Sequence, residues 1–219
     1  MNLKSGVDKG IDIKEKILRA AAEEFSDKGF GGARVDEIAN RAGVNKATLY
    51  YQIGDKAALY AEVLTMVMAS LADEMYKNLK RDVPPDEKLK SHIMTEAKTF
   101  GSNITFTRIM LREIASGGAS LPDEALMQMK RIISCTVSIL EEGKKAKVFG
   151  HVNPFIVHMM VIGTLLLYTA GEPIRKRISA LNSEASMLPV EQAAEDLADI
   201  LLKALRVSDQ TQNKENQDV

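Results

Sequence analysis

The polar and aromatic side chains best suited to chemistry lie close together in the first part of the chain. Gln52 can pair with the edge of an adenine base, and Lys46 can contact guanine or a phosphate group. The hydroxyl groups of Thr48 and Tyr50 can also reach phosphates. Lys56 follows at the expected start of another helix, where backbone amides attract anions as well. These residue types suit nucleic-acid binding, provided that the elements carrying them turn them outward.

Two short helices joined at a sharp corner would hold these residues. The spacing of apolar residues predicts one helix over residues 35–42 and another that follows Asn45, whose side chain can cap it, and ends by Gly54. Gly43 lies between them and tolerates the positive φ that a sharp corner requires. Ala39 is small enough for the two helices to cross closely. This arrangement is a helix-turn-helix, whose second helix lies in the major groove of DNA.

The overall charge does not favour nucleic-acid binding. The chain has 29 Lys and Arg residues against 30 Asp and Glu residues, a formal net charge of −1. Any attraction to DNA must therefore come from the local arrangement of charges. Glycine corners between short helices also occur in many proteins that do not bind DNA. A helical interaction module is thus the alternative, and only DNA binding predicts a steep loss of affinity with salt.

The rest of the chain has helical spacing almost throughout, which predicts an all-α fold of about nine helices. The first helix is expected over residues 13–28, ended by Gly29, and a long one over residues 56–80, capped by Asp55. Proline and glycine residues separate the later helices. These are expected near residues 86–100, 103–116, 122–147, 154–170, 173–181 and 189–206.

Residues 13–60 resemble the DNA-binding domain of the TetR family of bacterial regulators in order and spacing. The matching stretches are Ile17-Leu18-Arg19-Ala20-Ala21, Phe25 with Lys28-Gly29-Phe30, Val35 to Ala39 with Ala42-Gly43-Val44, and Thr48-Leu49-Tyr50-Tyr51 with Asp55-Lys56 and Leu59. The resemblance implies a dimer on a palindromic operator in double-stranded DNA. It also implies repression more often than activation, which leaves an activator of the same fold as an alternative.

The resemblance assigns base contacts to Lys46, Ala47, Tyr51 and Gln52 and phosphate contacts to Thr48, Tyr50 and Lys56. Arg34 stands where the family commonly has a capping Thr, and we expect it to contact a phosphate instead. Gln52 replaces a common His, which should shift the base preference without abolishing binding. The expected DNA-binding residues are Arg34, Asn45, Lys46, Ala47, Thr48, Tyr50, Tyr51, Gln52 and Lys56.

The resemblance further implies a sensing domain that pairs with a second subunit through its last two long helices. The run 155–163 is apolar on every face, so both of its sides need cover. We therefore expect a homodimer. The expected division is a loose N-terminus at 1–12, a DNA-binding domain at 13–60, a ligand-binding and dimerisation domain at 61–207 and a disordered tail at 208–219.

The resemblance implies a ligand cavity among the C-terminal helices, and we expect the middle helices to line it for a small apolar effector. Eleven methionines fit this expectation because methionine adapts to varied apolar ligands. Cys135 is either a further polar group in the cavity or a core residue, and Glu113 is expected to pair with a neighbouring Arg. The expected lining residues are Met94, Phe100, Phe106, Met110, Ile114, Met129, Ile133, Val137 and His158.

Enzymatic and membrane functions find no support in the sequence. His92, His151 and His158 are far apart and share no metal-ligand spacing, and the chain contains no nucleophile elbow or phosphate loop. We therefore expect no catalysis, no metal and no cofactor. One cysteine excludes an intramolecular disulfide, and the apolar run at residues 155–170 is short for a membrane span. A cytoplasmic protein that does not bind a membrane is expected.

Overall fold

The structure is a computed structural model that describes residues 12–181 and 188–207. The predicted disordered tail at 208–219 and all but Asp12 of the predicted loose N-terminus lie outside the described residues. The described part contains ten helices and no strand apart from one isolated β-bridge between Phe149 and Arg206. The helices are α1 (Ile13–Gly32), α2 (Val35–Ala42), α3 (Lys46–Gln52), α4 (Lys56–Leu79), α5 (Pro85–Ser102), α6 (Ile104–Ala115), α7 (Asp123–Lys145), α8 (Pro154–Ala170), α9 (Glu172–Leu181) and α10 (Val190–Leu205).

The all-α prediction is confirmed, with ten helices in the described part where about nine were expected. The short α9 corresponds to the helical segment predicted at 173–181 and follows α8 after the single residue Gly171. Local signals fix the helix starts in the N-terminal part: Asn45 Oδ1 accepts the Thr48 N–H at 2.7 Å, and Asp55 Oδ1 accepts the Ala58 N–H at 2.8 Å. The predicted stop at Gly29 is present as a break, with φ +70°, inside a helix that continues to Gly32.

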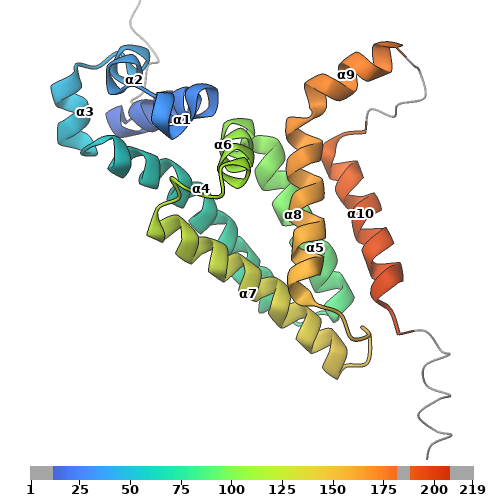
Figure 1. Ribbon diagram of the computed structural model, residues 1–219. Helices are drawn as coiled ribbons and strands as arrows, with labels where there is room; N and C mark the ends of the chain where they lie inside the picture. The colour runs from blue at the N-terminus through green and yellow to red at the C-terminus, as the bar shows by residue number, and fades with distance from the viewer. Residues whose placement is uncertain (1–11, 182–187, 208–219) are drawn as a thin grey trace, which may run out of the picture.

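Helices α1, α2 and α3 form a small unit at one end of the molecule. Figure 1 shows α4 leaving this unit and running alongside α7, with α5, α8 and α10 packed beyond them. One cluster of buried apolar side chains extends through the whole fold, from Phe25 in α1 to Leu201 in α10. The two parts of the molecule therefore share a continuous core.

Within the described ranges, no single helix is long and apolar enough to cross a membrane. Helices α8 and α9 reach the required length and composition only together, and they are bent by 65° relative to each other.

Candidate DNA-binding surface and effector cavity

The corner between α2 and α3 has the geometry of a helix-turn-helix. Gly43 ends α2 in the left-handed region at φ +68°, ψ +31°, and its N–H bonds to the carbonyl groups of Ala39 and Asn40. The Val44 N–H adds a 3.0 Å bond to the Ala39 carbonyl. Ile38 on α2 and Leu49 on α3 are fully buried between the helices and α1. A glycine is needed at position 43 because of its left-handed backbone conformation. Steric crowding is not the reason, because no neighbouring atom lies within 4 Å of where a Cβ would be.

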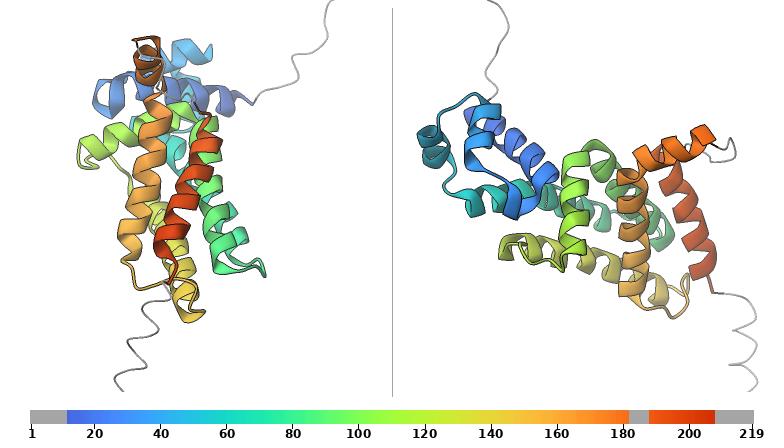
Figure 2. Two further views of the ribbon diagram at one scale, coloured as in Figure 1. Left: turned by 90° about the vertical axis from the view of Figure 1, so that its right-hand side faces the viewer. Right: turned by 45° about the horizontal axis from the view of Figure 1, so that its top comes forward.

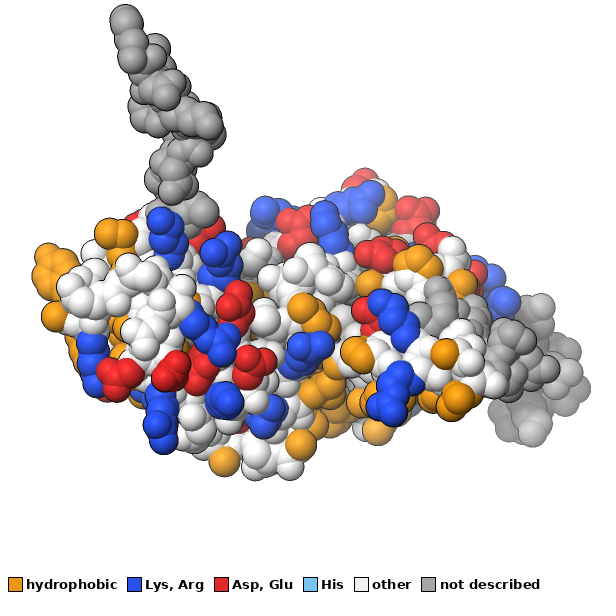
Figure 3. All heavy atoms as spheres, turned by 90° about the horizontal axis from the view of Figure 1, so that it is seen from above, with side chains coloured by type: hydrophobic (Ala, Val, Ile, Leu, Met, Phe, Trp, Pro, Cys, Tyr) orange, Lys and Arg blue, Asp and Glu red, His pale blue; other side chains and the backbone are white. Residues whose placement is uncertain are grey.

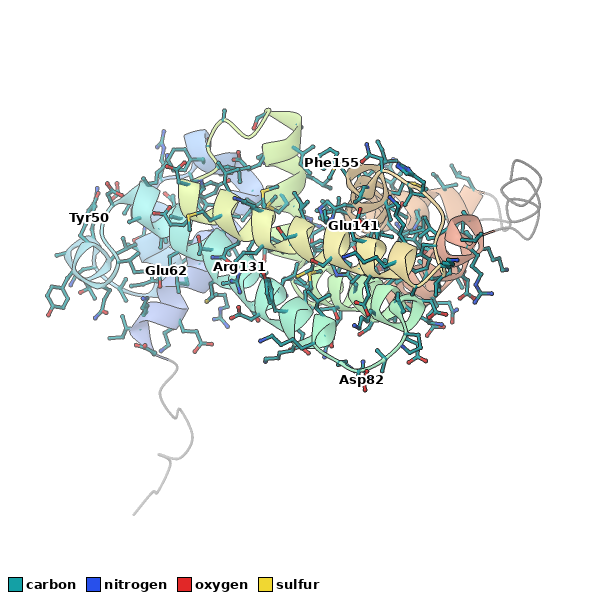
Figure 4. The ribbon with its side chains drawn as sticks, turned by 90° about the horizontal axis from the view of Figure 1, so that it is seen from below. Tyr50, Glu62, Asp82, Arg131, Glu141 and Phe155 are labelled. Carbon is teal, nitrogen blue, oxygen red and sulfur yellow. The ribbon has the colours of Figure 1, made fainter. Side chains whose placement is uncertain are left out.

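The opposite face of α3 is turned away from the core. Tyr51 has 88 % of its side-chain surface exposed, and Lys46, Ala47 and Gln52 are exposed around it. Figure 4 shows the exposed Tyr50 at the end of the molecule that this unit forms. Five predicted DNA-binding residues of α3 thus share one accessible surface, while Thr48 is half-buried.

Two residues of this surface already have partners within the protein. Asn45 caps α3 through its side-chain oxygen. Lys46 Nζ lies 2.8 Å from Asp36 Oδ1 of α2, and this hydrogen bond raises the pKa of the Lys46 ammonium above its ordinary value of 10.5. A phosphate or a base that binds Lys46 must compete with Asp36.

The predicted phosphate ligand Lys56 is engaged more fully. Its ammonium donates a 2.9 Å hydrogen bond to the Ala33 carbonyl and a 3.4 Å bond to the Gly31 carbonyl. It also lies 4.8 Å from the centroid of the Phe30 ring. Lys56 therefore stabilises the end of α1 in addition to any contact with DNA. Arg34 is exposed and occupies the N-cap position of α2 without a side-chain cap.

Charges of both signs surround the helix-turn-helix. Figure 3 shows Lys and Arg side chains intermingled with Asp and Glu side chains on the face seen from above. Part of this mixture consists of ion pairs, such as Arg41 with Glu24 at 3.1 Å and Lys14 with Glu62 at 2.5 Å. Individual side chains and backbone amides must therefore provide most of the affinity for phosphates, because the summed field of the unit is weak.

Helix α6 attaches the rest of the protein to this unit. Arg112 Nη2 donates to the carbonyl groups of Ser26 and Asp27 of α1, at 3.3 and 3.2 Å. The neighbouring Glu113 is buried and accepts hydrogen bonds from the Tyr60 phenol at 2.6 Å and from the Ser120 N–H at 3.2 Å. The prediction that Glu113 pairs with an Arg is thus wrong, because the Arg112 head group turns toward α1.

A cavity lies among α4, α5, α6, α7 and α8. The space in it that admits water-sized spheres is about 30 Å³. Its surface is almost entirely apolar, and two ionisable groups, Glu96 and His158, contribute to it. The lining residues are Met68, Leu71, Glu96, Phe100, Phe106, Met110, Met129, Ile132, His158, Ile162 and Leu166.

Comparison with known proteins also identifies the unit of α1, α2 and α3 as a helix-turn-helix domain and finds the same overall fold in solved structures. Residues 17–63 match the family model described as bacterial regulatory proteins, tetR family. The residues matched span most of α1, all of α2 and α3 and the start of α4, so this part of the chain is a helix-turn-helix domain of the tetR family.

Relatives and solved structures extend the likeness beyond this domain. The chain is 24 % identical to the HTH-type transcriptional regulator RutR of Escherichia coli over 193 residues, 88 % of this chain and 90 % of RutR. It is 27 % identical to the HTH-type transcriptional repressor SCO4008 of Streptomyces coelicolor, covering 88 % and 93 %. The structure of FadR from Bacillus subtilis in complex with stearoyl-CoA has the same fold, with a TM-score of 0.67, 17 % identity and coverage of 87 % and 98 %.

Five of the nine residues predicted to line a cavity lie in the wall of this one: Phe100, Phe106, Met110, Met129 and His158. Ile114 is 55 % exposed and Val137 is 37 % exposed, so their prediction as lining residues is wrong. Ile133 is half-buried and also lies outside the cavity wall, and Met94 lines a separate surface groove between α4 and α5.

The helix register explains these errors. The prediction placed Met129, Ile133 and Val137 on the inward face of α7, four residues apart. In the structure this face continues from Met129 to Ile132 and then to Thr136, in steps of three and four residues. On α6 the next inward position after Met110 is Glu113, and an acidic residue cannot be recognised as inward from apolar spacing. The sequence did not decide whether Cys135 lines the cavity or belongs to the core. It is fully buried outside the cavity, and burial raises the pKa of its thiol to about 11.

Three ionisable residues meet in the interior of the C-terminal helices, although the sequence suggested no metal-ligand spacing. His92 and Glu96 are one turn apart on α5, and His158 of α8 reaches the same point. The Thr136 hydroxyl lies 2.9 Å from His92 Nε2 and 3.2 Å from His158 Nδ1. His151 is exposed and does not belong to this group. The four-residue step from His92 to Glu96 was the signal in the sequence that could have indicated the group.

Burial changes the ionisation of all three groups. It lowers the pKa of His158 to about 4 and, together with the neighbouring His158, that of His92 to about 3. Burial raises the pKa of Glu96 to about 8. At neutral pH both imidazoles are therefore uncharged, with a lone pair available on each ring.

Proposed function

We propose that this transcriptional regulator is a repressor that acts in the cytoplasm as a homodimer, and that a small apolar effector releases it from a palindromic operator. In this proposal residues 13–60 bind DNA, while residues 61–207 bind the effector and form the dimer. The observation that carries it is the path of α4. This helix starts directly after α3 and, further along, contributes Met68 and Leu71 to the cavity wall.

The effector must enlarge the cavity in order to bind. The space of about 30 Å³ is far below the 300–1,000 Å³ typical of organic ligands. Met68, Met110 and Met129 line it, and methionine side chains rearrange at low energetic cost. Because Met68 belongs to α4, expansion of the cavity would displace that helix and, with it, α3. The stearoyl-CoA held by the FadR structure supports an acyl chain as one class of effector.

The proposed dimer uses α8 and α10. These helices lie side by side at the surface that faces the viewer in the left panel of Figure 2. Ile156, Met160 and Leu167 on α8 and Ile200 on α10 are exposed. A second copy would cover these apolar side chains. The two α3 helices must then lie about 34–36 Å apart to enter successive major grooves.

In this proposal the exposed face of α3 reads bases through Lys46, Ala47, Tyr51 and Gln52. Thr48, Tyr50, Arg34 and Asn45 would contact the flanking phosphates, as would Lys56. The balanced charge favours the alternative, a helical interaction module that does not bind DNA. The other alternative is an activator of the same fold. It would raise transcription of a reporter gene in an assay where a repressor would lower it.

The proposal is tested by selecting duplexes from a random DNA pool with the purified chain. We expect a palindromic sequence whose affinity falls linearly with salt on logarithmic axes. A failure to enrich any sequence, or affinity independent of salt, would favour the interaction module.

The effector part is tested on the selected duplex with stearoyl-CoA, using free coenzyme A as the control. Release by the acyl form alone is expected, and by linkage the duplex must weaken acyl binding by the same factor. Met129→Phe fills the cavity and should reduce release without changing DNA affinity. Met127→Phe is the matched control, because Met127 is exposed on the same helix. Equal release in the two variants would contradict the assignment of the cavity.

A further inference from the structure

His92, Glu96 and His158 form a compact cluster in the interior of the C-terminal helices. One possible ligand atom from each residue lies within 4.8 Å of the other two. All three side chains are buried, and two of the three also reach the cavity wall. Two imidazoles and one carboxylate are a common ligand set for divalent transition metals.

The carboxylate of Glu96 has nothing to bind among the described residues. It is 0 % exposed, and neither of its oxygens has a hydrogen-bond partner there. His92 Nε2 lies 3.7 Å from Oε1, which is too far for a hydrogen bond. No Lys or Arg lines the cavity. A buried carboxylate in this position opposes folding unless a proton or a cation neutralises it.

The size of the cavity distinguishes a metal ion from an organic cation. The accessible space of about 30 Å³ can hold an ion with a water molecule, since one water needs roughly 10–15 Å³ by the same measure. An organic cation with a carbon skeleton fits only if the cavity enlarges, whereas a metal ion needs no enlargement. The smallest occupant that neutralises Glu96 and uses both imidazoles is therefore a metal ion.

The separations of the ligand atoms are also close to those around zinc. With metal–ligand bonds of about 2.0–2.2 Å, two ligands of a tetrahedral site are about 3.4 Å apart. His92 Nε2 and Glu96 Oε1 are separated by 3.7 Å, and no pair exceeds 4.8 Å. Side-chain rotations would close these gaps. The Thr136 hydroxyl lies 2.9 Å from His92 Nε2 and 3.2 Å from His158 Nδ1, so an ion that binds either nitrogen replaces its contact with this hydroxyl.

We infer that His92, Glu96 and His158 bind one divalent transition-metal ion of the zinc class at the wall of the cavity. With three protein ligands the ion keeps at least one coordination position open to the cavity for water or another small ligand. The inference concerns α5 and α8 alone, so it holds whether or not the cavity also accepts an organic effector.

The test is a titration of the chelator-treated, full-length chain with Zn²⁺, and with Co²⁺ as a coloured probe. We expect one equivalent per chain for the wild type and for His151→Gln, which alters the exposed histidine. Glu96→Gln and His158→Gln should each weaken metal binding by about 100-fold or more. Loss of a residue that only hydrogen-bonds a metal ligand already lowers metal affinity by about 10- to 100-fold, and loss of a ligand should cost at least as much. Unchanged binding in both variants, or no saturable binding by the wild type, would overturn the inference.

Two measurements separate loss of the site from loss of the fold. Glu96→Gln keeps the shape of the side chain and removes the buried carboxylate, so the metal-free variant should melt no lower than the metal-free wild type. Zn²⁺ should raise the melting temperature of the wild type and of His151→Gln only. The X-ray absorption spectrum of the zinc-loaded wild type should show two imidazoles and no sulfur ligand. A sulfur ligand would assign the ion to Cys135 or a methionine and contradict the proposed site.

Discussion

The Tyr60 phenol donates a 2.6 Å hydrogen bond to Glu113 Oε1, and both side chains are buried. Tyr60 lies on α4 and also packs edge-on against Phe25 of α1, with ring centroids 4.7 Å apart. Glu113 lies on α6, three residues beyond the cavity residue Met110. One buried hydrogen bond thus connects the N-terminal unit, the long helix that leaves it and the helix that lines the cavity.

We predict that this bond makes the stability of the protein depend on alkaline pH. Burial, and then the hydrogen bond to Glu113, raises the pKa of Tyr60 far above its ordinary value of 10.0. The stabilisation is therefore complete below pH 10 and is lost as rising pH ionises the tyrosine of the unfolded chain. Tyr60→Phe should cost about 2 kcal/mol at neutral pH, because Glu113 keeps a buried acceptor without this donor.

Urea unfolding of the wild type and Tyr60→Phe at several pH values measures this dependence. The difference in unfolding free energy between the two proteins should shrink above pH 10. Tyrosinate absorbance should also show one tyrosine that ionises only when the wild type unfolds. A difference between the two proteins that stays constant with pH would mean that Tyr60 ionises in the folded state.

A second prediction concerns the contact of Arg112 with the end of α1. A Cβ on Gly29 would lie 2.8 Å from Arg112 Cδ, and Gly29 has a φ of +70°. Gly29→Ala should therefore destabilise the protein by about 1–3 kcal/mol and loosen α6 from α1. Gly31→Ala is the matched control, because its Cβ would meet nothing within 4 Å and its φ is not positive.

Thermal unfolding of single and double variants separates the two causes. In the Arg112→Ala background the steric part of the Gly29→Ala effect should disappear, while the backbone part remains. Gly31→Ala should be neutral or slightly stabilising. Equal effects of the two glycine substitutions would show that the approach of Arg112 to α1 does not require a glycine at position 29.

The sequence predicted the helices well because their ends are local features. Asn45 and Asp55 are capping residues, and Gly43 supplies a left-handed conformation, so each can be recognised from its neighbours in sequence. The faces of the short helices α2 and α3 were also predictable, since few registers bury both Ile38 and Leu49.

Contacts between distant helices could not be predicted in the same way. Tyr60 and Glu113 are 53 positions apart, and only the packing of α6 against α4 brings them together. The cavity wall depends on how α7 is rotated about its axis, and that rotation selects Ile132 over Ile133. Apolar spacing cannot decide this when both positions carry isoleucine, and it gives no signal for inward polar residues such as Glu96.

A third prediction distinguishes side chains that only contact DNA from one that also supports the fold. Tyr51→Ala should cost about 1–3 kcal/mol of binding to the selected duplex if Tyr51 touches a base. It should leave the melting temperature unchanged, because Tyr51 is exposed. Lys56→Ala should lower the melting temperature as well, since the carbonyl groups of Ala33 and Gly31 lose their donor.

The salt dependence of binding tests the role of Lys56 in DNA contact. Loss of one phosphate contact should reduce the salt slope by about one for Lys56→Ala, whereas Tyr51→Ala should leave the slope unchanged. A Lys56→Ala slope equal to that of the wild type would assign Lys56 to the stability of α1 alone.

The last prediction concerns the apolar surface of α8. Ile156 is 55 % exposed and Leu167 is 65 % exposed, and both lie on the surface proposed for the dimer. Glutamate at both positions should produce a monomer in sedimentation, because a buried, unpaired carboxylate on each side opposes association. Ile114→Glu is the control: Ile114 is as exposed as Ile156 but lies on α6, so this variant should stay dimeric.

The monomer should also lose affinity for the palindrome, and the size of the loss indicates how the sites are coupled. In a dimer, the second α3 binds at a high effective concentration once the first is bound, which raises affinity by about 10²–10⁴-fold. The double variant should lose that factor on the palindrome and little on a single half-site, while retaining the wild-type fold by circular dichroism. If Ile114→Glu dissociated the dimer and the double variant did not, subunits would pair through α6, and the two α3 helices would need a different relative placement to reach the same DNA.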